Sequence, residues 1–140
     1  DRVSRGLGDV YKRQVKDLTG GKGADVIYDP VGGEVFDQSI RCINWGGRLL
    51  IIGFAGGTIP TLPVNYPLIK GFSVVGVRAG EFGRRDPLLG RENIDIINSL
   101  AEDNKIRPHI CKIFDFIDSK KALEFLENRE LIGKVVIRIS

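Results

Sequence analysis

The architecture of this chain follows from one run of residues, Gly47-Arg-Leu-Leu-Ile-Ile-Gly-Phe-Ala-Gly-Gly57. The first half of the run is branched and apolar, and glycine bounds it on both sides. Such a run is typical of a strand buried on both faces, as in a parallel sheet covered by helices. Sheets of this kind bind ligands where their strands end. The glycine-rich end of this strand is therefore the first candidate for a binding site.

The segments around this strand predict alternating strands and helices. Before it, Ala24–Asp29 predicts a short strand that ends at Pro30-Val31-Gly32-Gly33, and residues 34–44 predict a helix that ends at Gly46-Gly47. The later segments predict a proline-containing loop over 58–67, a strand over 71–77, a polar segment over 78–91, a helix from near Glu92 that packs on the sheet, a strand over 107–114, a helix over 118–127 and a strand over 133–139. This order is typical of the second half of a doubly wound α/β sheet of the Rossmann type.

Three smaller features of the packing are also predicted. Residues 15–19 are expected to be the last turns of a helix, and Trp45 is expected to be a packing residue. In the 118–127 helix, Asp118 or Ser119 is the expected N-cap. The spacing predicts that Ala122, Leu123 and Leu126 face inward.

Charge and composition limit the classes of function. The chain has 140 residues, of which 42% are hydrophobic and 28% charged, with a net charge of +3, as in a soluble domain with its own core. The excess of basic residues comes mostly from residues 1–14, and the remainder is nearly neutral. Without a basic face, we expect no nucleic-acid partner.

The chain also lacks the sequence features of membrane and secreted proteins. No apolar stretch is long enough to span a bilayer, so we expect no membrane partner. The two cysteines, Cys42 and Cys111, stand in no disulfide or metal-ligand pattern. His109 and Cys111 form an isolated pair to which we assign a structural role, because a metal site needs further ligands. A cytoplasmic location is predicted.

The ends of the early strands form the candidate site. In a parallel sheet the ends at 29–33, 53–57 and 78–80 are expected to lie together. Glycine there allows a ring or an amide to approach the backbone; the alternative is that these glycines simply end strands. Asp29 is expected to cap the turn that follows it rather than to act as an acid or base.

Four motifs carry a family resemblance. They are Lys22-Gly-Ala-Asp-Val-Ile-Tyr-Asp-Pro-Val-Gly-Gly33, Gly46-Gly-Arg-Leu-Leu-Ile-Ile-Gly-Phe-Ala-Gly-Gly57, Leu68-Ile-Lys-Gly-Phe-Ser-Val-Val-Gly-Val77 and Leu131-Ile-Gly-Lys-Val-Val-Ile137. From about Val15 to Ser140 the chain resembles the C-terminal part of the medium-chain dehydrogenase/reductase superfamily, and within it the zinc-independent NADPH:quinone oxidoreductases. The resemblance implies hydride transfer from NADPH to quinones or to other activated carbonyl or alkene acceptors.

The resemblance also implies a set of cofactor-binding residues. Val31 and Gly32 are expected beside the ribose, and Gly53 and Phe54, with the neighbouring Ala55, against the nicotinamide and its carboxamide. The implied cofactor is NADP, with NAD as the alternative, and the substrate is a small molecule. Neither catalytic side chains nor metal ligands are expected in this chain.

Three further residues complete the set that the resemblance implies. Gly133 and Lys134 are expected near the cofactor phosphates or the nicotinamide. Arg78 stands where many relatives carry an aromatic residue, and its guanidinium is suited to a phosphate instead.

The chain is expected to be one part of a larger enzyme. It contains no GxGxxG motif, which in the family precedes the point where this chain begins. Residues 1–14 resemble translated cloning-linker sequence, notably Asp9-Val-Tyr-Lys-Arg-Gln14, and are interpreted as a non-native leader. Residues 15–106 are interpreted as a partial dinucleotide-binding domain, and residues 107–140 as a segment that completes the catalytic domain of the parent enzyme.

Several interpretations of function and assembly follow. The chain alone is expected not to turn over NADPH with quinones. The alternatives are a fragment of a zinc-dependent alcohol dehydrogenase, whose ligands would lie outside this chain, and a non-catalytic α/β binding or assembly module. The strand Gly71–Val77 is expected to be an open edge through which the protein forms a homodimer. The opposite edge, Val26–Tyr28, is expected to be unpaired.

Overall fold

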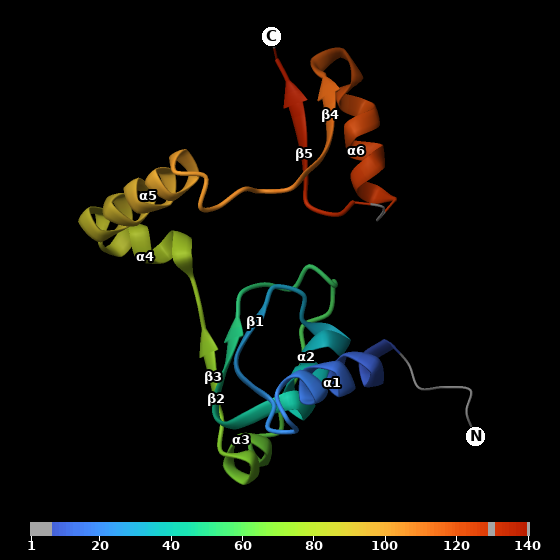
Figure 1. Cartoon of the computed structure of the whole chain (residues 1–140), viewed down its shortest axis with the longest axis vertical. Helices are drawn as coiled ribbons and strands as arrows, with labels where there is room; N and C mark the ends of the chain where they lie inside the picture. The colour runs from blue at the N-terminus through green and yellow to red at the C-terminus, as the bar shows by residue number, and fades with distance from the viewer. Residues whose placement is uncertain (1–6, 129–130, 140) are drawn as a thin grey trace. The chain divides into compact units, whose positions relative to one another are not determined.

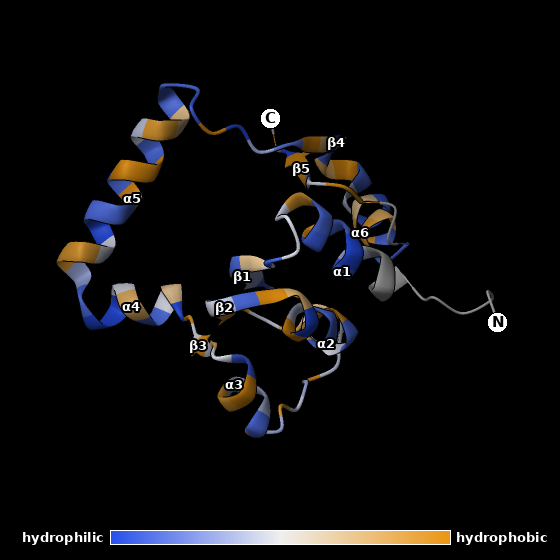
Figure 2. Ribbon diagram, turned by 60° about the horizontal axis from the view of Figure 1, so that its bottom comes forward, coloured by the Kyte–Doolittle hydropathy of each residue, from blue (hydrophilic) through white to orange (hydrophobic). Residues whose placement is uncertain are grey.

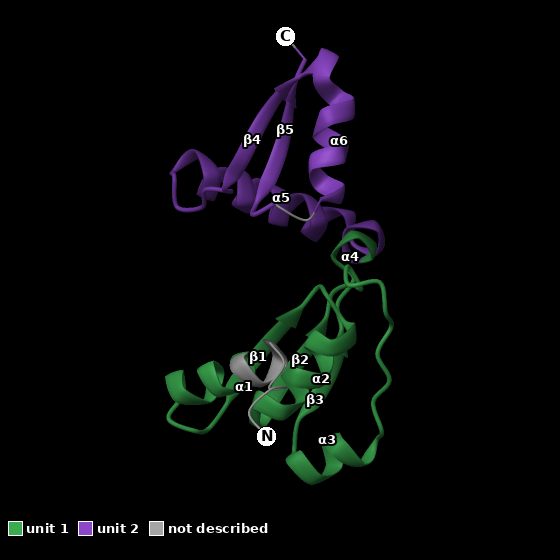
Figure 3. Ribbon diagram, turned by 90° about the vertical axis from the view of Figure 1, so that its right-hand side faces the viewer, with its two compact units in different colours: residues 1–81 green, residues 82–140 purple. Residues whose placement is uncertain are grey.

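The structure, a computed structural model, describes residues 7–128 and 131–139. The chain divides into two compact units, one ending at Glu81 and one beginning at Phe82 (Figure 3). Each unit is described by itself. The predicted boundaries at residues 14/15 and 106/107 stay predictions.

The first unit contains a parallel sheet of three strands. In chain order its elements are α1 (Leu7–Leu18), β1 (Ala24–Asp29), α2 (Gly33–Cys42), β2 (Ile43–Ile51), α3 (Asn65–Lys70) and β3 (Ser73–Gly76) (Figure 1). The strands lie in the order β1-β2-β3, and both pairs are parallel. The predicted α/β fold of the Rossmann type is confirmed. Within the described residues β1 and β3 each pair with β2 alone, so both predicted edges are open.

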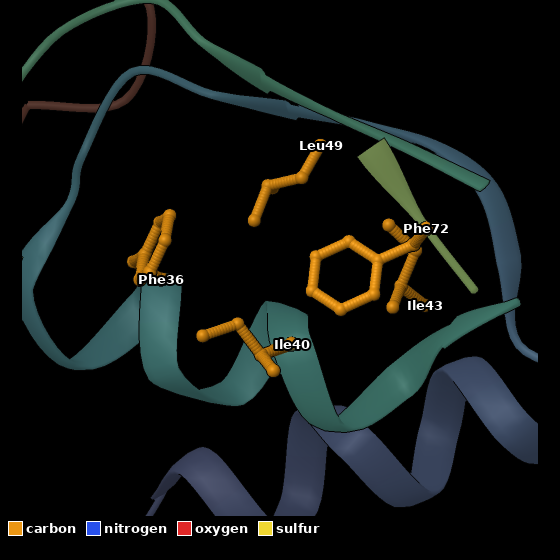
Figure 4. Packing of buried hydrophobic residues seen from close by; sticks show 5 residues of the cluster. All are labelled: Phe36, Ile40, Ile43, Leu49 and Phe72. Atoms are coloured by element: carbon orange, nitrogen blue, oxygen red, sulfur yellow. The ribbon is translucent and has the colours of Figure 1, made fainter. Parts of the chain in front are cut away.

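The core of this unit lies between β2 and α2. Leu49 of β2 has no exposed surface, and Phe36 and Ile40 of α2 point toward it, together with Ile43 and Phe72 (Figure 4). Burying a side chain of this size contributes roughly 1.5–3 kcal/mol. The sequence predicts that β2 is buried on both faces. The structure confirms this only in part, since the side chain of Leu50 is half-buried.

The boundaries of β2 differ from the prediction. The strand begins at Ile43, runs through Gly46 and Gly47, and ends at Ile51, whereas α2 stops at Cys42. Ile43 is extended, with φ −73° and ψ 143°, and it pairs with Ala24. Burial and pairing of Ile43 therefore override the helical spacing that predicted a helix to residue 44.

The proline-containing segment ends in a helix that the sequence did not predict. Pro67 lies in the first turn of α3, which follows the N-cap Val64. The first N–H groups of a helix have no intrahelical acceptor, so the missing N–H of proline costs nothing there. Proline at this position is therefore compatible with a helix.

At the amino end of the sheet, segments that are distant in the sequence contact one another. The Trp45 side chain is 75% exposed, yet its ring lies against Gly71, which ends α3 in the left-handed conformation. Gly46 N–H donates to Gly71 O. The Nζ of Lys70 donates to Ile40 O. Trp45 is thus a packing residue, as predicted, although one of its faces meets solvent.

The second unit contains a parallel pair of strands and a helix beside it. Its elements are α4 (Ala79–Arg85), which begins in the first unit, α5 (Pro87–Glu102), β4 (Ile110–Asp115), a short 3-10 turn (Phe116–Asp118), α6 (Ser119–Glu127) and β5 (Lys134–Arg138). The predicted inward position is confirmed for Ala122, which is 1% exposed. It is wrong for Leu123 and Leu126, which are 59% and 42% exposed, because a sheet of two strands is too narrow to cover the whole helix face.

Helix α5 begins earlier than predicted. Asp86 is its N-cap and accepts from Leu89 N–H at 3.1 Å, and Pro87 occupies the first turn. Asp-Pro is a recognised helix start, so the signal was present in the sequence. Polar and apolar residues alternate around α5 (Figure 2), and Ile94 and Ile97 are exposed. Its packing on the sheet stays a prediction. No helix in the described ranges is long and apolar enough to cross a membrane.

Candidate functional site

Two loops at the carboxyl end of the sheet are joined by backbone hydrogen bonds. Exit loop 1 (residues 29–33) runs from the last residue of β1 to the first residue of α2, and exit loop 2 (residues 52–57) follows β2. Three N–H groups of exit loop 2, those of Ile52, Ala55 and Gly56, donate to the carbonyls of Asp29, Pro30 and Val31 at 3.0, 3.0 and 2.9 Å. The end of β3 lies beside the end of β2, because Val77 N–H donates to Ile51 O at 3.0 Å. The predicted meeting of the strand ends is therefore observed for residues 29–33 and 53–57, whereas that of residues 78–80 stays a prediction.

Asp29 organises exit loop 1. Its side chain is 2% exposed, and Oδ1 accepts from the N–H groups of Val31 and Gly32 at 2.8 and 2.9 Å. A buried carboxylate needs such donors, and its charge is favoured beside the first turn of α2. The prediction that Asp29 caps the following turn is confirmed.

The absence of a side chain at Gly32 allows two neighbours to approach. Gly32 has φ 71° and ψ −156°, a conformation that is essentially restricted to glycine. A Cβ there would lie 3.0 Å from Cδ1 of Phe54 and 3.1 Å from the carbonyl oxygen of Thr58. Thr58 was not predicted as a site residue, and it could not have been, because its contact is made by the backbone.

The surface around Gly53 and Phe54 is accessible. A Cβ on Gly53 would meet only Pro30 O, at 3.4 Å. The Phe54 side chain is 42% exposed. A flat ring can therefore approach the backbone at Gly53 beside an apolar side chain. A cleft of about 270 Å³, lined by residues that include Gly33, Asp37 and Thr58, lies next to exit loop 1.

The structure brings together five of the eight predicted site residues. Val31, Gly32, Gly53, Phe54 and Ala55 lie on exit loops 1 and 2. We call the surface formed by these five residues the exit surface.

The other three predicted residues lie elsewhere in the chain. Arg78 follows β3, is exposed, and has a guanidinium nitrogen 4.0 Å from a carboxylate oxygen of Glu81. Gly133 and Lys134 lie in the second unit, where Lys134 N–H donates to His109 O at 2.8 Å. The predicted role of Arg78 stays a prediction, and so do those of Gly133 and Lys134, which depend on how the two units are arranged.

Two titratable groups with shifted pKa values lie away from the exit surface. Burial raises the pKa of the Cys42 thiol above its usual 9.0, and burial lowers the pKa of Lys70 below its usual 10.5. Cys42 borders a mostly apolar cleft of about 480 Å³ beside α1, α2 and β1. These groups lie at the carboxyl ends of α2 and α3, so they offer no acid or base to a ligand on exit loops 1 and 2.

Comparison with known proteins connects this geometry with a family of reductases. A "Quinone oxidoreductase-like protein 2 homolog" from Nematostella vectensis is 40% identical over 127 residues, which are 90% of this chain and 35% of the relative. The chain thus spans about a third of the length of this curated relative.

Solved structures share the fold. A quinone oxidoreductase from Pseudomonas syringae pv. Tomato DC3000 matches with a TM-score of 0.76 and 21% identity, over 91% of this chain and 39% of that one. A mycobacterial protein solved in complex with NADPH matches with a TM-score of 0.76 and 23% identity, over 94% of this chain and 41% of that one.

The family model that matches the chain is described as "Zinc-binding dehydrogenase" and covers residues 5–137. Within the part of the chain that the structure describes, no group of three or more His, Cys, Asp or Glu side chains could hold a metal ion. These residues therefore do not fit a zinc site. The fold, the paired exit loops and the family model agree on the conclusion that the chain belongs to the zinc-binding dehydrogenase family of the medium-chain dehydrogenase/reductase superfamily.

Proposed function

We propose that this chain forms the nicotinamide-binding part of an NADPH-dependent oxidoreductase of the quinone oxidoreductase kind. The observation that carries the proposal is the exit surface, in which two glycine-containing loops are held together beside an exposed aromatic ring. Ligands of doubly wound sheets bind at such strand ends. The name of the Nematostella relative supports a quinone reductase rather than another member of the family.

Each residue of the exit surface would have a physical task. Val31 and Gly32 would lie beside the ribose. Gly53 would let the flat nicotinamide ring approach the backbone, and Phe54 would supply apolar surface. The Ala55 N–H already donates to Pro30 O, so Ala55 would contribute surface rather than a hydrogen bond.

The charged residues of the predicted set would act on the phosphates. Arg78 would pair with a cofactor phosphate, and Lys134, with Gly133 beside it, would do so from the second unit. When bound, NADPH supplies the hydride, and the protein supplies position and orientation. NADP is the proposed cofactor, and NAD is the alternative.

The proposed reaction is the two-electron reduction of quinones or of other activated carbonyl or alkene acceptors. We infer that the 140-residue chain alone does not perform it, since it spans about a third of its relative. We also propose a homodimer through the open edge of β3, whose residues are all exposed.

Titration of the purified chain with NADPH and with NADH, followed by the nucleotide's own fluorescence, tests the proposal. We expect NADPH to bind, and Phe54→Ala to weaken binding by about tenfold, the effect of removing an aromatic contact. The matched control is Phe116→Ala, which removes an exposed aromatic ring from the second unit. No NADPH binding, or equal loss in both variants, would contradict the proposal.

Two further results bear on the alternatives, one from the same titration and one from an activity assay. Tighter binding of NADH than of NADPH would favour NAD as the cofactor and would support the alternative of an alcohol dehydrogenase fragment. Quinone-dependent oxidation of NADPH by the purified chain would refute the proposed inactivity.

A further inference from the structure

We propose that Asp29 is a positioning residue for the exit surface. Its buried carboxylate fixes exit loop 1 in the conformation to which exit loop 2 binds. The inference deepens the proposed function and rests on it for the link to a nicotinamide cofactor. The coupling between the two loops can be tested without any cofactor.

The first step of the argument is the geometry inside exit loop 1. A single oxygen, Oδ1 of Asp29, accepts from the N–H groups of both Val31 and Gly32. Hydrogen bonds to an ionised acceptor are stronger than neutral ones. With 2% of its surface exposed, Asp29 has almost no water to take the place of either donor. The two bonds therefore determine the direction of the peptide units at residues 30–32.

The second step is what those peptide units present to exit loop 2. The carbonyls of Pro30 and Val31 accept from Ala55 and Gly56 N–H at 3.0 and 2.9 Å. Each carbonyl belongs to the same peptide unit as an N–H that Asp29 binds, since the peptide bond is planar. Turning the N–H of Val31 or Gly32 away from Asp29 therefore turns the carbonyl away from exit loop 2.

The third step concerns Phe54, which directly precedes Ala55 and Gly56, the two residues whose N–H groups bind the carbonyls of Pro30 and Val31. Cδ1 of its ring lies 3.0 Å from the position that a Cβ on Gly32 would occupy. Release of exit loop 1 would change both the backbone under this ring and the hydrogen bonds on its C-terminal side. The three residues Gly53, Phe54 and Ala55 thus depend on a side chain that does not itself need to touch a ligand.

Amide hydrogen exchange, measured residue by residue by NMR on the full chain, tests the coupling. In Asp29→Ala we expect exchange at Val31, Gly32, Ala55 and Gly56 to rise by about tenfold or more, as for loss of a charge-assisted hydrogen bond. Exchange at Gly46, whose N–H donates at the other end of the sheet, should be unchanged. Asp29→Asn keeps an acceptor at Oδ1 and should exchange more slowly than Asp29→Ala at the same amides. Asp17→Ala, an exposed aspartate of α1, is the matched control.

Three exchange results would overturn the proposal. The first is a rise in the exchange rate that is confined to the amides of exit loop 1. The second is an equal rise at Gly46, which would mark a general loss of stability. The third is amide exchange in Asp29→Asn that is as fast as in Asp29→Ala.

NADPH titration of the same variants tests the consequence for binding. We expect the dissociation constant to rise by about tenfold in Asp29→Ala, less in Asp29→Asn, and not in Asp17→Ala. Unchanged affinity in Asp29→Ala, with its exchange raised as expected, would refute the positioning role. A wild-type chain that binds no NADPH would refute the proposed function instead, while the exchange data would still decide whether Asp29 couples the loops.

Discussion

Replacing Gly32 by alanine should destabilise the first unit by an amount that follows from its geometry. The φ of 71° and ψ of −156° place residue 32 where a residue with a Cβ is strained by about 1–3 kcal/mol. The new Cβ would also lie 3.1 Å from Thr58 O, which belongs to the backbone and cannot move alone, and 3.0 Å from the Phe54 ring. With this crowding we expect a total loss of about 2–4 kcal/mol.

Two glycine variants separate strain from crowding. Gly57 has a φ of +85° with no atom within 4 Å of an added Cβ, so Gly57→Ala should show backbone strain alone. Gly76 has neither a positive φ nor a close neighbour, and Gly76→Ala should change the free energy of unfolding by less than about 0.5 kcal/mol.

The assay is urea unfolding followed by the fluorescence of Trp45, the single tryptophan of the chain, which reports on the first unit. Comparing midpoints among the three variants avoids treating the two units as one transition. A Gly32→Ala variant as stable as Gly76→Ala would refute the conformation described for exit loop 1. A Gly32→Ala variant equal to Gly57→Ala would show that Thr58 and Phe54 do not crowd the position.

Four other predictions concern the core, the thiols and the sheet edge. Leu49→Ala removes a side chain with no exposed surface and should cost about 2–5 kcal/mol in the same urea assay, whereas Leu68→Ala, an exposed leucine of α3, should cost little. A thiol reagent should label the exposed Cys111 in the folded chain and both cysteines only after unfolding. Burial raises the pKa of Cys42 in the folded state, so the thiol loses its proton at lower pH in the unfolded chain. The free energy of unfolding should therefore fall as pH rises above 9.0. The Cys42→Ala variant should lack this fall, and the same pH dependence in the variant and the wild type would contradict the prediction. Val75→Lys places a charge on the open β3 strand and should shift sedimentation toward the monomer, and a wild-type chain that is already monomeric would rule out the proposed dimer.

The sequence predicted best what depends on near neighbours. The turn at Asp29 follows from the residue itself and from the proline and glycines after it, and the parallel strands follow from short β-branched runs between glycines. The same local logic explains why Ala122 was placed correctly.

The errors arose where distant contacts or helix-end rules decide the outcome. Ile43 joins β2 because it pairs with Ala24 and is buried, which its position at the end of a helical pattern does not reveal. Pro67 lies in a helix because the first turn tolerates proline, although three prolines in ten residues predict a loop. Leu126 meets solvent because the sheet of the second unit has two strands. The role of Gly133 beside the cofactor was neither confirmed nor contradicted, because it depends on the arrangement of the two units, which no local pattern encodes.

The contact of Trp45 with Gly71 has a consequence for how this protein can change. This contact holds the start of β2 against the end of α3, and the buried cluster around Leu49 holds β2 against α2. The exposed residues Phe54 and Arg78 contribute to neither. Substitutions at these two positions should therefore cost the first unit little folding stability. Under the proposed function, the surface that meets the ligand can therefore vary in sequence while the contacts that fold the unit stay the same.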